Sequence, residues 1–272
     1  MIKFPNGIIS LKRRLKKNNL FFTRYLMAFS GSAQTEKITN GHFEIKYDKD
    51  VEPYAIASAR ILNFTWNKLD ELGFKPPKKI KFNLVKSDRD MLYTDKNKPI
   101  ITLEYTSLDW SKNRPNYVYG LCHEMGHVCM FHITPNKNNW MTLDYREAWA
   151  HYLGKSMIVS LYEKFGVDVW HTPYNYLVQL TESLNIQTQS FEKGEDRFRG
   201  FLISVSFWEK LVSEKGMDKI PFFFEQIKSN RVRNPNAVKK FKTELVKFGV
   251  SNDILDYFDQ NIQHLIWLGN IE

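Results

Sequence analysis

The sequence predicts an α+β fold, in which a small mixed β-sheet in the N-terminal part packs against a mainly α-helical C-terminal part. Two observations support this class. Between residues 42 and 105, short segments alternate apolar and polar side chains, which is typical of half-buried strands. From residue 116 onward, apolar residues recur every three or four positions, which is typical of helices that bury one face.

A β-α-β-β unit is expected at residues 42–105. Its first strand is HFEIKYD (42–48), in which one face carries Phe43, Ile45 and Tyr47. A helix follows, because apolar residues recur at steps of four and three: Ala55, Ala59, Leu62, Trp66 and Leu69. Gly73 and Pro76–Pro77 end this helix.

Two further strands complete the unit, at 78–85 and 99–105. The first of them alternates, with apolar residues at Ile80, Phe82 and Leu84.

The pattern of apolar residues in the second half of the chain predicts a series of helices. Asn116 can cap a helix that runs to about Phe131, and Pro135 ends it. A second helix runs from about Asp144 to Phe165. Further helices are predicted at 196–215, ended by Gly216, at 219–229, at 235–248, ended by Gly249, and at 252–266.

The chain divides into three predicted parts: a basic and apolar targeting segment or tail at 1–34, an α/β subdomain at 35–131, and a helical subdomain at 132–272. The first part runs from basic residues through an apolar stretch to small residues, as a secretory signal does. This order predicts an exported protein (secreted, periplasmic or at the cell surface). The alternatives are a cytoplasmic protein with a basic tail, or contact of residues 1–34 with a membrane surface.

Charge and cysteine content narrow the function further. The net charge is +9, but residues 1–34 contribute +7 of it, so the rest of the chain is nearly neutral and no nucleic-acid partner is predicted. The two cysteines, Cys122 and Cys129, are seven residues apart on one predicted helix. Their Cα atoms are then about 10 Å apart, which is too far for a disulfide. We expect reduced thiols in the core.

The stretch YGLCHEMGHVCM (119–130) carries three polar residues in an apolar helix. His123 and His127 are four residues apart, so both imidazoles project from one face and can reach a single zinc ion. Glu124 lies beside them, where a carboxylate can accept a proton from water that zinc has made more acidic. The spacing therefore predicts a Zn²⁺ site with Glu124 as general base.

A catalytic zinc takes three protein ligands. Met130 and Ile133 occupy the positions where a metzincin-type glycine and third histidine would stand, so the third ligand must come from elsewhere. Glu147, on the next helix, is the best candidate, and it places the site in the cleft between the two subdomains. Asp144 and His151 are the reserve ligands. Alternatively, Glu147 caps its own helix in a capping box begun by Asp144.

The second helix can approach the first closely, because it carries small residues: Ala148, Ala150, Gly154 and Ser156. On the same helix, His151 lies one turn beyond Glu147. It is expected to hydrogen-bond a ligand or the substrate, with an ordinary helix histidine as the alternative.

Two segments, HEMGH (123–127) and WMTLDYREAWAHY (140–152), resemble the gluzincin superfamily of zinc metallopeptidases. The second resembles the W-x-x-E-G-x-A-x-Y stretch around the glutamate ligand of that superfamily. The resemblance implies zinc ligation by His123, His127 and Glu147, and catalysis by Glu124. It also implies that the strand at 99–105 is the sheet edge along which a peptide lies.

The resemblance has departures. Ala148 replaces a glycine, His151 replaces an aspartate, and no Gly-x-Met-x-Asn segment precedes the helix, which argues against aminopeptidase activity. The residue that would stabilise the oxyanion stays open among Tyr145, Tyr152, Arg197 and Arg199.

The leading hypothesis is a zinc metallopeptidase that acts on a peptide or protein substrate. The alternative is a zinc-stabilised binding protein of the same fold without catalytic activity.

Overall fold

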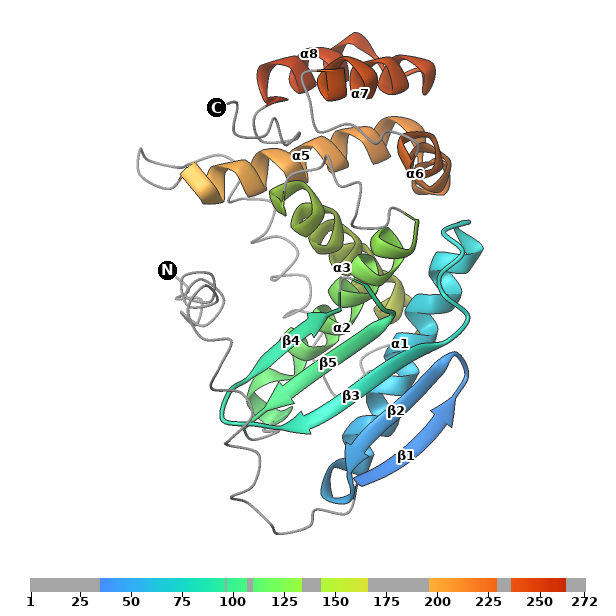
Figure 1. Cartoon of the computed structure of the whole chain (residues 1–272), viewed down its shortest axis with the longest axis vertical. Coiled ribbons are helices and arrows are strands. Elements are labelled where there is room, and N and C mark those ends of the chain that lie inside the picture. The colour runs from blue at the N-terminus through green and yellow to red at the C-terminus, as the bar shows by residue number, and fades with distance from the viewer. Residues whose placement is uncertain are drawn as a thin grey trace. The chain divides into compact units, whose positions relative to one another are not determined.

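The computed structural model describes residues 35–95, 97–106, 110–133, 143–165, 196–228 and 236–262 (Figure 1). Thr35–Glu272 form one compact unit, and the predicted targeting segment 1–34 lies outside the described residues. A mixed five-stranded sheet is followed by a mainly helical part, so the predicted α+β class is confirmed. The boundary at residue 131 between two subdomains stays a prediction.

The strands are β1 (Thr35–Asn40), β2 (Phe43–Asp48), β3 (Ile80–Lys86), β4 (Met91–Thr94) and β5 (Ile100–Tyr105). The helices are α1 (Glu52–Glu71), α2 (Trp110–Ile133), α3 (Leu143–Phe165), α5 (Asp196–Lys215), α6 (Ile220–Lys228), α7 (Asn236–Lys247) and α8 (Asn252–Gln260). Short 3₁₀ turns precede α1 and α6.

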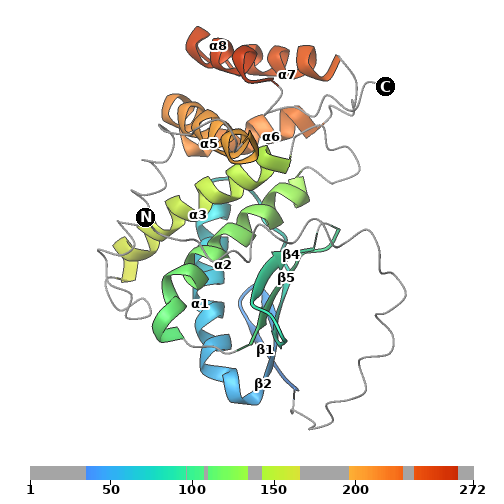
Figure 2. The ribbon, with the colours of Figure 1, turned by 90° about the vertical axis from the view of Figure 1, so that its left-hand side faces the viewer.

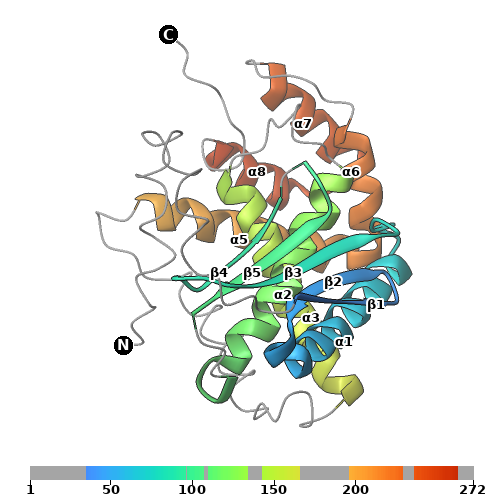
Figure 3. The same cartoon turned by 60° about the horizontal axis from the view of Figure 1, so that its bottom comes forward.

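The sheet has the strand order β1-β2-β3-β5-β4, with a parallel centre and an antiparallel strand at each edge. Its register aligns the predicted apolar positions, because Ile45 pairs with Phe82, and Phe82 pairs with Ile101. These side chains are fully buried on the face that α1 and α2 cover (Figure 2). In Figure 3 the strands cross in front of the same two helices.

The predicted apolar stripe of α1 and the three glycine helix ends are confirmed. All five stripe residues of α1 are buried. Gly73, Gly216 and Gly249 follow α1, α5 and α7 with φ of +88°, +86° and +73°, a conformation that favours glycine and ends a helix. For the predicted helix 252–266, α8 ends at Gln260, and residues 263–266 lie outside the described residues.

Three expectations are wrong. The strand at 99–105 is not an edge strand, because β5 pairs with β3 on one side and with β4 on the other. β1 and β4 were not predicted, so the β-α-β-β unit is in fact β-β-α-β-β-β. Asn116 does not cap α2, which begins six residues earlier, at Trp110.

Small residues bring α2 and α3 into close contact, as predicted. A Cβ on Gly126 would lie 2.9 Å from the Cα of Ala150, and one on Gly154 would lie 3.2 Å from the backbone nitrogen of His123. Real Cβ atoms essentially never approach other atoms to less than 3.0 Å, so Gly126 permits a separation that alanine would not.

An aromatic cluster holds α3 against the remaining helices. The ring of Trp149 lies 4.8 Å from Trp208 on α5, 5.2 Å from Phe224 on α6 and 5.4 Å from Phe74, which follows α1. α5 packs on α3, α6 lies beside α5, and α7 and α8 lie on the far side of α5 (Figures 1 and 2). Within the described residues, no helix is long and apolar enough to cross a membrane.

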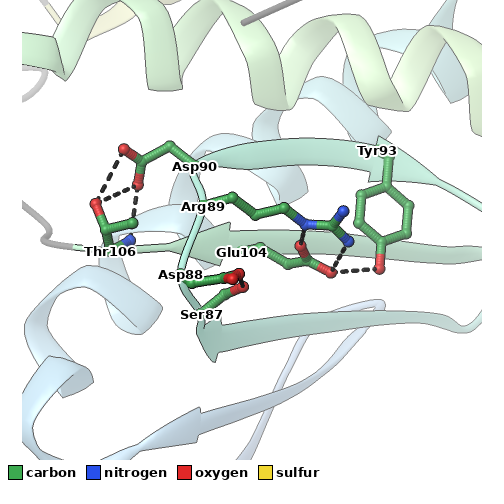
Figure 4. A network of polar contacts seen from close by, with 7 residues as sticks. All are labelled: Ser87, Asp88, Arg89, Asp90, Tyr93, Glu104 and Thr106. Carbon is green, nitrogen blue, oxygen red and sulfur yellow. Dashed lines mark hydrogen bonds and ion pairs between the residues drawn. The ribbon is translucent and has the colours of Figure 1, made fainter. Parts of the chain in front are cut away.

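The edge strand β4 is fixed by polar contacts at both ends (Figure 4). Arg89 forms an ion pair with Glu104 of β5, and the Tyr93 hydroxyl donates to the same carboxylate at 3.1 Å. Asp90 accepts a hydrogen bond of 2.8 Å from the backbone N–H of Thr106. These contacts hold a strand of only four residues in register on the sheet.

The glycine contact between α2 and α3 can be tested by substitution. We expect Gly126→Ala to lower the free energy of unfolding by about 1–3 kcal/mol, because the added methyl group meets backbone. Gly120→Ala is the matched control on the same helix. Its Cβ would meet only the end of the flexible Leu92 side chain, so the change is neutral or gains up to about 1 kcal/mol of helix propensity. Urea denaturation measures both, and equal stabilities would contradict the argument.

Candidate metal centre

Three metal-ligating side chains converge from two helices. Nε2 of His123 and Nε2 of His127, both on α2, lie 3.1 Å apart. Oε2 of Glu147, on α3, lies 3.6 Å from the first nitrogen and 3.4 Å from the second. Among the described residues, these three form the one group of histidine, cysteine and acidic side chains close enough together to share a metal ion.

The size of this triangle fits zinc. Atoms separated by 3.1, 3.4 and 3.6 Å lie on a circle with a radius of about 2.0 Å, close to the usual Zn–N and Zn–O bond lengths. Two ligands at about 2.05 Å in a tetrahedral site are about 3.3 Å apart, which lies within the observed range. Two imidazoles and one carboxylate are also the donor set of a common class of catalytic zinc sites. The residues present therefore fit Zn²⁺.

The three donors differ in exposure to solvent. The side chains of His127 and His123 are 8% and 16% exposed, whereas that of Glu147 is 42% exposed. The histidines are thus held inside the protein, while solvent reaches the group from the carboxylate side. A catalytic site needs such access, because one coordination position must stay available to water or substrate.

Glu147 does not lie where a capping-box glutamate would lie on α3. α3 begins at Leu143, so Glu147 lies past the first turn, and its carboxylate faces the two imidazoles. Burial acts to raise the pKa of Glu147, but the contacts with His123 and His127 outweigh it and hold the pKa well below its usual range. Of the reserve ligands, the side chain of Asp144 lies outside the described residues.

Glu124 follows His123 on α2 and contacts Thr94 at the end of β4. It is 7% exposed, and its backbone oxygen accepts a hydrogen bond of 3.2 Å from the Thr94 hydroxyl. Burial raises the pKa of its carboxyl group, and His123 together with hydrogen bonds from Thr94 offsets part of that rise. A carboxylate in this setting is a stronger base than one in water.

His151, the other reserve ligand, lies outside the triangle. Its Nδ1 forms a hydrogen bond with the hydroxyl of Tyr119, which also lies 3.4 Å from Nδ1 of His123. Burial lowers the pKa of His151 to about 3, so the ring is neutral. Sequence reasoning missed Tyr119, although it precedes His123 by four residues and therefore faces the same side of α2.

The remaining sequence predictions are resolved in part. Cys122 and Cys129 are buried free thiols, as expected, and burial raises the pKa of Cys122 to about 12. Among the oxyanion candidates, Tyr152 packs against Trp149, and the side chains of Tyr145, Arg197 and Arg199 lie outside the described residues.

No protein-family model matches the chain, and no curated protein matches it. The resemblance to gluzincins therefore stays a prediction, as does the location of the site in a cleft between two subdomains.

If His123, His127 and Glu147 bind metal together, the protein should bind one Zn²⁺ per chain. We expect Glu147→Gln, which keeps the shape and removes the charge, to weaken Zn²⁺ binding by more than the 10–100-fold typical of residues that only support a ligand. Glu163→Gln is the control, because Glu163 lies on the same helix and is exposed. Metal analysis gives the stoichiometry, and competition with a chromophoric chelator gives the affinity. Equal affinity in both variants would exclude Glu147 as a ligand.

Proposed function

We propose that the protein is a zinc-dependent hydrolase in which His123, His127 and Glu147 hold the metal. The observation that carries this proposal is the triangle of two imidazole nitrogens and one carboxylate oxygen, whose size fits zinc bond lengths. When bound, Zn²⁺ supplies Lewis acidity, which makes water more acidic and polarises a carbonyl group.

Within this class, we infer that the chain is a peptidase with Glu124 as its general base. The carboxylate is buried next to His123, and burial raises its proton affinity. In this role it accepts a proton from the attacking water and then delivers it to the nitrogen of the leaving amine. The pairing of Glu124 with the two histidines in HEMGH supports a hydrolase of the peptidase type.

The edge strand β4 offers a surface for an extended peptide. One side of β4 pairs with β5, and its other side pairs with none of the described strands. The strand ends at Thr94, which contacts Glu124, so a peptide added along this edge would pass the base. β4 thus takes the role that the sequence assigned to the strand at 99–105.

The alternative, a zinc-stabilised binding protein without catalysis, has weaker support. Structural zinc sites usually have four protein ligands, and only three donors meet among the described residues. A structural site also has no need for a buried carboxylate such as Glu124, which is costly to desolvate. Export and membrane contact through residues 1–34 stay predictions.

The experiment that tests this proposal is digestion of a mixed peptide library by the zinc-loaded protein, followed by mass spectrometry. Glu124→Gln should keep one Zn²⁺ per chain and lower kcat/KM by about 10²–10⁴-fold, because only proton transfer is removed. Glu163→Gln should retain wild-type activity. Full hydrolysis by Glu124→Gln would exclude the mechanism. Zinc binding by the wild type without cleavage of any peptide would favour the binding protein.

A further inference from the structure

We propose that Tyr119 and His151 form a hydrogen-bonded relay that fixes the tautomer and the orientation of His123 for metal binding. This inference rests on the proposed metal site and concerns residues that lie behind it. Tyr119 and His123 are on α2, whereas His151 is on α3. The relay therefore links the same two helices as the metal triangle does.

The Tyr119 hydroxyl lies between two imidazole rings. It is 3.4 Å from Nδ1 of His123 and hydrogen-bonds Nδ1 of His151. The Tyr119 ring meets the His151 ring edge-on, with centroids 5.4 Å apart and an interplanar angle of 72°. Gly154 makes room for this arrangement, because a Cβ there would lie 3.1 Å from Cε2 of Tyr119.

The proposed relay assigns a direction to each hydrogen bond. A neutral imidazole carries one N–H, and metal binding through Nε2 of His123 places it on Nδ1. Nδ1–H then donates to the Tyr119 oxygen. A phenol has one hydrogen of its own, which Tyr119 donates to the unprotonated Nδ1 of His151. The chain of donors therefore runs from His123 through Tyr119 to His151.

His151 makes this direction the favoured one. Nε2 of His123 lies 3.1 Å from Nε2 of His127, so the opposite tautomer of His123 could donate between the two rings. In that tautomer Nδ1 of His123 would compete for the Tyr119 proton. Because His151 accepts that proton, the Tyr119 oxygen presents lone pairs to His123 and favours the form whose Nε2 is free to bind metal.

Within the described residues, His127, the second proposed ligand histidine, is held by ring stacking and not by a hydrogen bond to its Nδ1. Nδ1 of His127 is buried and has no hydrogen-bond partner in the described part of the chain, while its ring stacks on Phe131 at 5.6 Å and 9°. Ligand histidines usually donate their second N–H to a partner that fixes the ring, and removal of such a partner weakens metal binding by about 10–100-fold. In this site the relay supplies that partner for His123.

Zinc affinity, measured by competition with a chromophoric chelator, tests the relay. Tyr119→Phe removes the hydroxyl and should weaken Zn²⁺ binding by about 10–100-fold. Tyr257→Phe is the control, because it deletes a tyrosine hydrogen bond of 3.1 Å to the Ile203 carbonyl and should leave zinc affinity unchanged. An affinity of Tyr119→Phe within about threefold of the wild type would overturn the relay.

Two nearly isosteric variants test the role of His151. His151→Asn keeps an acceptor near the position of Nδ1 and should recover most of the affinity, whereas His151→Leu should lose it. Adding His151→Leu to Tyr119→Phe should cause little further loss, because both changes break the same chain. Equal affinities of the Asn and Leu variants, or additive losses in the double variant, would remove His151 from the relay.

Imidazole ¹⁵N chemical shifts of the metal-free protein separate failure of the relay from failure of the proposed function. The wild type should carry the His123 proton on Nδ1, and His151→Leu should shift the population toward Nε2–H. This measurement of the His123 tautomer needs no metal. Absence of zinc binding by the wild type would overturn the metal site itself, whereas zinc binding together with an unchanged tautomer in His151→Leu would overturn the relay alone.

Discussion

The close packing of α2 on α3 is the constraint on which the rest of the site depends. Gly126 lies against the backbone of Ala150, and Gly154 lies against the backbone of His123, so the helices approach more closely than residues with a Cβ would allow. Only this separation lets a glutamate of one helix reach two histidines of the other at 3.4 and 3.6 Å.

The two layers around this helix pair keep it in place. On one side, α2 packs on the sheet, and Leu92 and Thr94 of β4 reach it at Gly120 and Glu124. On the other side, Trp149 packs α3 into an aromatic cluster. Truncation of a buried tryptophan to alanine typically lowers the free energy of unfolding by about 3–5 kcal/mol. Apolar packing on both sides of the helix pair thus sets the geometry of the polar groups.

Local sequence patterns located most of the helices, three of the five described strands and part of the site. Alternation located β2 and β3, 99–105 was identified as a further strand, and the spacing of His123 and His127 placed both on one face of a helix. β1 and β4 were missed because their side chains are mostly exposed or half-buried, so neither strand carries a row of fully buried apolar residues. Strand order was not predictable either, because alternation shows which face is buried but not which strands pair. Tyr119 was missed for a related reason: its role depends on His151, a partner 32 residues away on another helix.

The relay also explains why a histidine can stand where the gluzincin resemblance would place an aspartate. Glu147 faces the imidazoles, and Glu124 is buried on the same helix as they are, so two carboxylates already lie near the proposed metal position. A third carboxylate would place further negative charge in a region of low dielectric, where repulsion between like charges is strong, and it would weaken the attraction of the metal for substrate oxygen. In the proposed relay, Tyr119 and a neutral His151 would orient His123 through hydrogen bonds alone. The site thus gains a support for its ligand without adding charge.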